Sequence, residues 1–212
     1  MTFSIVACNL RDEVWGVAVA SRFLAVGSMV PAAEIDAGAL ATQAQTNMSF
    51  RKHGLAMLRA GLDPQEVLAN LLADDEERKK RQVGLVDRRG NAVTWTGCEC
   101  QPFAGGRSGG GYAVQGNFLQ GPEVLDAMAE SWLTSDKLAP LPHRLLAALA
   151  SGDASGGDRR GRQAAALFVV RRDGHYRYCS DVEVDLRVDD SEYPISELRR
   201  LLALHDELPI PP

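Results

Sequence analysis

The amino-acid sequence predicts an α+β fold in which antiparallel sheets carry pairs of helices on their outer faces. Strand-like runs are joined locally by short polar turns, and helix-like runs arrive in pairs between them. The regular alternation of one strand with one helix, which is typical of a nucleotide-binding fold, is missing. The 212 residues can bury a sizeable core and show no repeat or linker, so we expect one domain over residues 1–212.

The first half of the chain supplies two strand pairs and then two helices. The expected strands are 3–8, 14–20, 33–36 and 39–45, and the expected helices are 49–60 and one that begins after residue 63. The second helix has the clearest signal, because Asp63 is a natural N-cap, Pro64 suits the first helical position and Glu66 completes a capping box.

The second half continues with strands, two helices, strands and a last helix. Its expected elements are a hairpin of 82–87 with 92–97, a strand at 112–117, helices at 122–133 and 142–150, a closing hairpin of 163–170 with 176–188, and a helix near 194–205. The glycine-rich stretch 104–111 lacks the lysine and hydroxyl residue of a phosphate-binding loop, which favours a mobile loop near a cleft that could act as a lid.

Charge and composition exclude several classes of partner. The formal net charge is −5 and the pI is about 5.4, so the overall field repels nucleic acid and anionic membranes. In the run DDEERKKRQ each acid precedes a base by four residues, which predicts a solvated helix face. No apolar run spans a membrane and no signal peptide is recognisable, so we expect a cytoplasmic protein. Cys98 and Cys100 have the wrong spacing for a zinc site, so no metal is expected.

Five stretches together resemble a known bacterial family. The stretches are TFSIVA, GVAVASRFLAVGSMVP, ATQAQTN, YAVQGN and GGDRRGRQAAAL, and the resemblance covers roughly residues 2–205. The family is called domain of unknown function 1028 and is assigned to the N-terminal-nucleophile (Ntn) hydrolase superfamily. This resemblance implies a four-layer αββα sandwich of two antiparallel sheets with helix pairs outside. It also implies a homo-oligomer, because the superfamily often builds oligomers.

The resemblance gives the second residue a possible catalytic role. The opening is similar to that of a proteasome β-type subunit, in which a first-residue threonine precedes a short strand, a turn and a second strand. Thr2 corresponds to that threonine and VWGVAVAS to the second strand. A threonine hydroxyl needs a base beside it, and a free α-amine on the same residue can serve, provided that Met1 is removed.

Polar residues at strand ends are the natural lining of a cleft near Thr2. The amides can recognise a neutral amide or peptide-like group, or else serve as turn and cap residues. The loop GGDRRGRQ could bind a carboxylate through a guanidinium fork, or else hold only a surface ion pair. The candidate substrate-binding residues are Ser21, Arg22, Gln43, Asn47, Gln115, Asn117, Asp158 and Arg159.

The sequence therefore predicts hydrolysis of an amide bond in a small molecule, with Thr2 as the catalytic residue and no metal or organic cofactor. The alternative is a non-catalytic protein that binds a small ligand on the same scaffold. Ser21 stands where the resemblance would place an acidic residue, and this favours the alternative.

Overall fold

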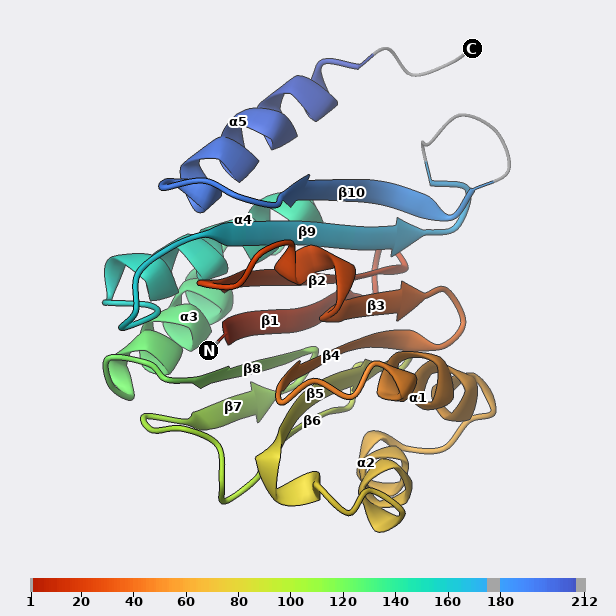
Figure 1. Cartoon of the computed structure of the whole chain (residues 1–212). Coiled ribbons are helices and arrows are strands. Elements are labelled where there is room, and N and C mark those ends of the chain that lie inside the picture. Colours follow the sequence, from red (N-terminus) through yellow and green to blue (C-terminus); the bar gives the residue numbers. More distant parts are fainter. Residues whose placement is uncertain (1, 175–179, 209–212) are drawn as a thin grey trace.

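The computed structural model describes residues 2–174 and 180–208, and these ranges contain two sheets (Figure 1). In the larger sheet every neighbouring pair of strands is antiparallel. Across this sheet the strands are β10 (Val182–Val188), β9 (Ala164–Arg171), β2 (Val14–Ser21), β1 (Thr2–Asn9), β8 (Tyr112–Asn117) and β7 (Gly105–Gly109). The first strand of the chain is therefore central, and β2 and β8 flank it.

The smaller sheet is also antiparallel throughout. Its strands in order are β3 (Pro31–Glu34), β4 (Gly38–Ala44), β5 (Arg81–Asp87) and β6 (Ala92–Thr96). This sheet is formed by two hairpins, as the local turn signals predict. The helix pair α1 and α2 is inserted between the hairpins.

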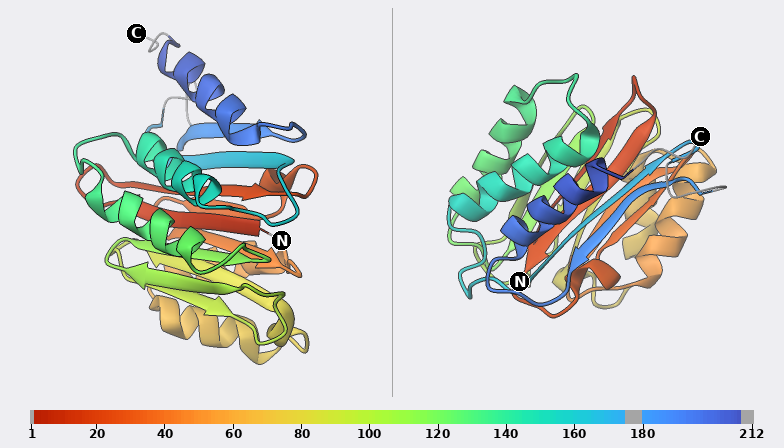
Figure 2. Two further views of the ribbon diagram at one scale, coloured as in Figure 1. Left: turned by 90° about the vertical axis from the view of Figure 1, so that its left-hand side faces the viewer. Right: turned by 90° about the horizontal axis from the view of Figure 1, so that it is seen from above.

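Within the described ranges, five α-helices lie on the outside of the sheets (Figure 2). They are α1 (Ser49–Arg59), α2 (Pro64–Ala73), α3 (Glu123–Thr134), α4 (Leu141–Ala154) and α5 (Pro194–Asp206). The predicted capping box of α2 is present, since the Asp63 carboxylate accepts the backbone N–H groups of Gln65 and Glu66. No helix in the described ranges has the length and apolar character needed to cross a bilayer.

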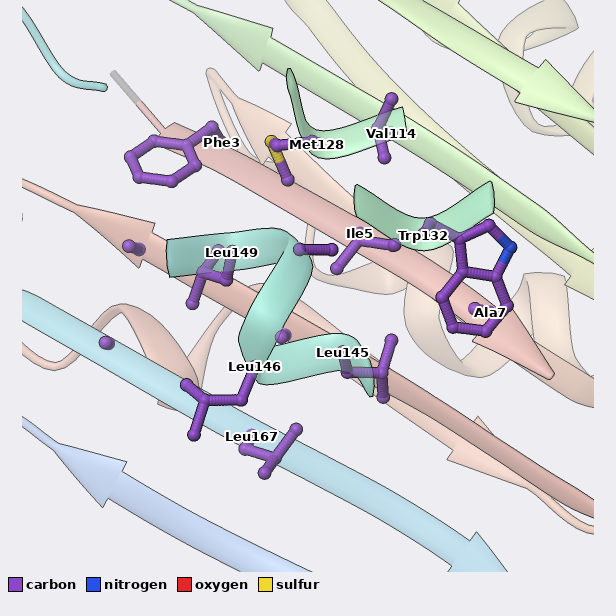
Figure 3. Close-up of a cluster of buried hydrophobic side chains, with 14 of the residues drawn as sticks. Phe3, Ile5, Ala7, Val114, Met128, Trp132, Leu145, Leu146, Leu149 and Leu167 are labelled. Carbon is purple, nitrogen blue, oxygen red and sulfur yellow. The ribbon is translucent and has the colours of Figure 1, made fainter. Parts of the chain in front are cut away.

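Because side chains alternate between the two faces of each strand, the buried apolar residues form three layers. In β1, Phe3 and Ile5 point toward α3 and α4 (Figure 3), whereas Val6 and Cys8 point toward the smaller sheet. The third apolar layer, which includes Leu40, packs the smaller sheet against α1 and α2. The order of layers is therefore helices, sheet, sheet, helices (Figure 2).

Two predicted segments differ from the structure. Helix α2 ends at Ala73, so the charged run 74–81 is not a helix face. A turn, a short 3₁₀ helix (Arg78–Lys80) and the start of β5 take its place. Of the four predicted i,i+4 ion pairs, Glu77 with Arg81 is present, with Oε2 and Nη2 3.2 Å apart. The stronger partner of Arg81 is Asp75, at i,i+6, because the chain turns back between them.

The glycine-rich stretch 104–111 is not a loop. Residues Gly105–Gly109 form the edge strand β7, which pairs with β8. Glycine fits here because a Cβ at Gly106 would overlap with the Thr94 side chain of β6. The lid interpretation therefore has no support in the fold. In the closing hairpin, β10 begins at Val182, and residues 175–179 of the predicted strand lie outside the described residues.

Candidate functional site

Thr2 opens the central strand of the larger sheet. It lies opposite Asn117 of β8, and on its other side the strand β2 ends at Ser21. Only 6% of Thr2 is exposed, and its Oγ1 lies 3.2 Å from Oγ of Ser21, with either hydroxyl able to donate. Because odd-numbered residues of β1 point to the helices, Thr2 and Ser4 point into the layer between the sheets.

A buried network of side-chain amides surrounds this end of the strand. Gln43 of β4 donates from Nε2 to the Thr2 carbonyl oxygen at 3.2 Å, and Asn117 donates from Nδ2 to the same oxygen at 3.5 Å. Both NH₂ groups also donate to Oε1 of Gln82 on β5, each at 2.8 Å. The three amides are 0–1% exposed. Buried amides with several partners hold one arrangement, so this network fixes the main chain at Thr2.

Ser4 and Gln115 extend the network deeper between the sheets. Gln115 donates from Nε2 to Oγ of Ser4 at 2.6 Å, and Ser4 donates to Oε1 of Gln43, also at 2.6 Å. The structure thus brings Gln43, Gln115 and Asn117 together. Their amide groups bond to the protein itself, and Gln43 and Gln115 are fully buried. These amides are therefore placed to support the main chain around Thr2.

Sequence reasoning missed Gln82, which is the hub of the network. Its Nε2 donates to the carbonyl oxygens of Gly116 and Gly105 at 2.8 and 3.1 Å, so it joins β5 to β8 and β7. The signal was present in QVGLVD, where Gln82 occupies the same face of β5 as Gly84 and Val86. Val86 belongs to the apolar layer between the sheets. A polar side chain on the same face of the strand is therefore expected to be buried and to need a hydrogen-bond partner.

Asn47 belongs to a neighbouring cluster. Its Oδ1 accepts from the Ser49 backbone N–H at 3.1 Å at the start of α1, and its Nδ2 donates to Asp75 at 3.1 Å. Asp75 forms a two-bond ion pair with Arg81, at 2.8 and 3.0 Å. The hydrogen bonds from Arg81 lower the pKa of Asp75 to about 2, against the opposing effect of burial. Asn47 is thus a helix-opening residue tied to a structural ion pair.

Asp158 fixes the loop that carries the candidate arginines. Its carboxylate accepts the backbone N–H groups of Arg22 and Arg160, both at 2.8 Å, and it is 7% exposed. The side chain of Arg160 also reaches it, with Nη2 3.3 Å from Oδ2. Asp158 therefore ties this loop to the end of β2, beside Ser21.

Arg159 and Arg160 both contact one aromatic ring. Their Cζ atoms are 5.1 and 5.2 Å from the centre of the Phe118 ring, and both side chains are exposed. Phe118 directly follows Asn117, and its backbone has the left-handed φ of 55°. A bulky residue rarely adopts this conformation, and such positions cluster at ligand sites.

A cavity of about 690 Å³ opens beside Asn117 and Phe118. Its volume is within the range of small-molecule sites. The lining residues are Ala44, Gln45, Lys80, Cys98, Glu99, Cys100, Gln101, Pro102, Asn117 and Phe118. Ala44 follows Gln43 and, like Phe118, is left-handed, with a φ of 66°. Two strands that carry network amides thus end in this wall. Thr2 is not itself a lining residue, and Asn117, which bonds to its carbonyl oxygen, connects it to the cavity.

Metal binding has no support among the described side chains. Residues 2–174 and 180–208 contain no group of three or more His, Cys, Asp or Glu residues placed to hold an ion. Cys98 and Cys100 both line the cavity, and burial raises the pKa of the Cys100 thiol.

Comparisons with known proteins identify a family and structural relatives, among them the following crystal structure. The family model described as "Family of unknown function (DUF1028)" matches residues 2–198. Protein SPO2555 from Silicibacter pomeroyi, whose crystal structure is described as DUF1028, is 31% identical with a TM-score of 0.86. The match covers 96% of this chain and 88% of that chain. No curated protein matches.

Proposed function

This chain belongs to the DUF1028 family of unknown function, and we propose that it is an amide-bond hydrolase of the N-terminal-nucleophile type. Thr2 is the nucleophile, and the substrate is a small molecule with an amide or peptide-like bond. The order of layers, with two antiparallel sheets between helices, is compatible with the αββα sandwich of that superfamily.

The observation that carries the proposal is the support given to Thr2. Two buried amides hold its carbonyl oxygen, and one of them, Asn117, also lines the 690 Å³ cavity. A strand-opening threonine with a merely structural role does not need three amides and a serine arranged around it. Burying polar groups is costly unless they are paired. The pairing here is centred on Gln82, and the two amides that donate to Gln82, those of Gln43 and Asn117, also hold the Thr2 carbonyl oxygen.

The chemistry follows from the two functional groups of Thr2. After removal of Met1, the α-amine has an ordinary pKa near 7.7–8.0 and can accept the hydroxyl proton directly or through one water. The hydroxyl oxygen then attacks the amide carbonyl carbon, and the leaving amine takes the proton. Water hydrolyses the resulting ester and restores both groups.

Asn117 is the side-chain amide best placed to stabilise the tetrahedral intermediate. Its NH₂ group makes one short bond, to Gln82, and one long bond, at 3.5 Å, to the Thr2 carbonyl oxygen, so an oxyanion within reach of that second hydrogen would replace the weaker bond. One such donor can supply roughly 2.7–4 kcal/mol of transition-state stabilisation. Ser21, 3.2 Å from the Thr2 hydroxyl, orients the nucleophile.

The first test is the mass of the intact chain combined with substitutions at Thr2. We expect a chain without Met1 that turns over members of a small-amide library. T2V keeps the shape and the β-branch of threonine but removes the hydroxyl, so it should abolish turnover, whereas T2S should retain part of it. Thermal melting of each variant checks folding, and T42V, which alters another buried threonine, is the matched control.

Two results would contradict the proposal. One is turnover by a chain that retains Met1, because Thr2 then has no free amine. The other is a folded T2V variant that is as active as the unchanged protein.

The second candidate is a small-ligand-binding protein without catalysis. One observation favours it: within residues 2–174 and 180–208, the Thr2 hydroxyl has Ser21 as its hydrogen-bond partner and no charged group. Ligand retained through purification, together with no turnover of amides or esters by the processed chain, would select this function over hydrolysis.

A further inference from the structure

We propose that the molecule bound in the cavity beside Thr2 carries a carboxylate, and that Arg159 receives it at the rim. This inference rests on the proposed function only in taking this cavity as the site. It concerns the class of substrate, which the position of Thr2 does not determine.

The first observation concerns the charges of the arginines near the cavity. Arg159 is exposed and forms no ion pair with any residue in the two described ranges. Its neighbour Arg160 provides a contrast, because its charge is matched by Asp158. Arg22, whose backbone N–H donates to Asp158, also donates from its guanidinium to the Arg160 carbonyl oxygen. Arg159 is therefore the arginine of the segment 158–162 whose charge has no carboxylate partner among residues 2–174 and 180–208.

The second observation is that Arg159 is held in place. Its Cζ atom lies 5.1 Å from the centre of the Phe118 ring, which is within the range of a cation–π contact. Its backbone N–H donates to the Phe118 carbonyl oxygen at 3.3 Å. The residues beside this pair, Leu119 and Asp158, form a β-bridge. Phe118 itself lines the cavity. The guanidinium is therefore held against a residue of the cavity wall before a ligand arrives, which lowers the entropic cost of binding.

The other charges indicate a single carboxylate. Lys80 lines the cavity, but its charge is matched by Glu77 at 3.0 Å, and Glu99 adds a negative charge to the lining. The whole chain has a net charge of −5. A polyanion would meet these acids as well as the arginines. One carboxylate on a guanidinium fork makes two parallel hydrogen bonds and needs only Arg159.

The test compares two ligands that differ in this one charge. N-acetylglycine has an amide and a carboxylate, and its N-methylamide is the neutral match. Binding is measured by calorimetry and by NMR of the arginine side-chain Nε–H signals, with T2V protein so that turnover does not interfere. We expect N-acetylglycine to bind about tenfold more tightly or better and to shift the Arg159 signal.

Substitutions assign the effect to Arg159. R159Q should remove the preference for the carboxylate, and R159K should restore part of it. R89Q is the matched control, because Arg89 is an exposed arginine beyond Asp87, at the opposite end of β5 from Gln82. Equal affinity for both ligands, no shift at Arg159 with either, or an unchanged preference in R159Q would overturn the inference.

The outcomes separate this inference from the proposed function. Carboxylate-selective binding that depends on Arg159, without turnover by the processed unsubstituted protein, supports the inference and contradicts hydrolysis. Turnover of neutral amides that R159Q leaves unchanged supports hydrolysis and overturns the inference.

Discussion

At the scale of single residues, the environment of each thiol determines its chemistry. Cys8 lies on the face of β1 that points between the sheets, and burial is the main reason why its pKa is raised to about 12. Cys98 is exposed at the cavity, and Cys100 is half-buried with its sulfur 3.3 Å from the Arg81 carbonyl oxygen. Cys179 lies outside the described residues.

We predict that iodoacetamide modifies Cys98 much faster than Cys8. At pH 8, a thiol with a pKa near 12 is a thiolate only about once in ten thousand molecules, and the thiolate is the reactive form. Peptide mass spectrometry after timed labelling measures the two rates. Labelling in urea is the control and should make the two rates similar. Comparable labelling in the folded protein would contradict the burial of Cys8.

The candidate site shows which residues a sequence can reveal. Thr2, Gln43 and Asn117 are recognisable because amides and hydroxyls are conspicuous in small or apolar strands. Their contacts with one another are not recognisable, because Thr2 and Asn117 belong to the larger sheet and Gln43 to the smaller one, and tertiary packing brings the two sheets together. The same limit applies to Asp158, whose backbone acceptors Arg22 and Arg160 depend on how the loop meets β2.

At the scale of elements, strand periodicity and cap signals predict most helices and strands. The errors occur where a contact that the local pattern does not reveal decides the conformation. The run after Ala73 has the charge spacing of a helix, but Arg81 is drawn into a buried pair with Asp75, so the chain turns and starts a strand. Gly105–Gly109 has no strand propensity of its own and is ordered by pairing with β8.

Gly84 lets the two sheets pack closely at the network because it has no side chain. A Cβ at Gly84 of β5 would overlap with the side-chain amide of Gln115 on β8. We predict that G84A lowers the free energy of unfolding by about 1–3 kcal/mol, as overpacking does in other cores. Urea denaturation measures the change.

The double variant G84A/Q115A tests the cause of this effect. It should lose less stability than the two single changes added together, because the two side chains then no longer collide. G110A is the matched control, since nothing lies within 4 Å of a Cβ there. Strict additivity would show that Gln115 is not what excludes a side chain at Gly84.

At the scale of the whole molecule, the layer between the sheets is polar at one end and apolar at the other. Thr2, Ser4 and the amides of the network occupy one end, whereas Val6, Cys8 and Val86 occupy the other. The apolar end supplies hydrophobic stabilisation, and the polar end provides directed hydrogen bonds beside the cavity. This division could be predicted only in part, because it requires the registers of both sheets.

The Asp75–Arg81 pair makes stability depend on pH. The folded-state pKa of Asp75 is about 2, below its ordinary value of 3.8, so this contribution is present above pH 4 and is lost as the pH falls toward 2. The two side chains are 7% and 9% exposed. We predict that D75N lowers the free energy of unfolding by at least about 2 kcal/mol at neutral pH, because it also leaves Arg81 without its main partner.

Urea denaturation at a series of pH values measures this prediction. The difference between the unchanged protein and D75N should shrink between pH 4 and pH 2. D36N is the control, because Asp36 pairs with Arg172 at the surface with 58% of its side chain exposed, and it should change stability little. A difference between D75N and the unchanged protein that does not vary with pH would contradict the lowered pKa.

The position of β1 has a practical consequence for anyone who purifies this protein. A peptide fused in front of Thr2 would emerge beside Asn117, where it could fill the cavity and would replace the free amine by an amide bond. Helix α5 lies at the far edge of the larger sheet, on β9 and β10 (Figure 1). An affinity tag placed after this helix would leave the pocket open, and only a preparation of that kind can show whether the pocket has chemistry of its own.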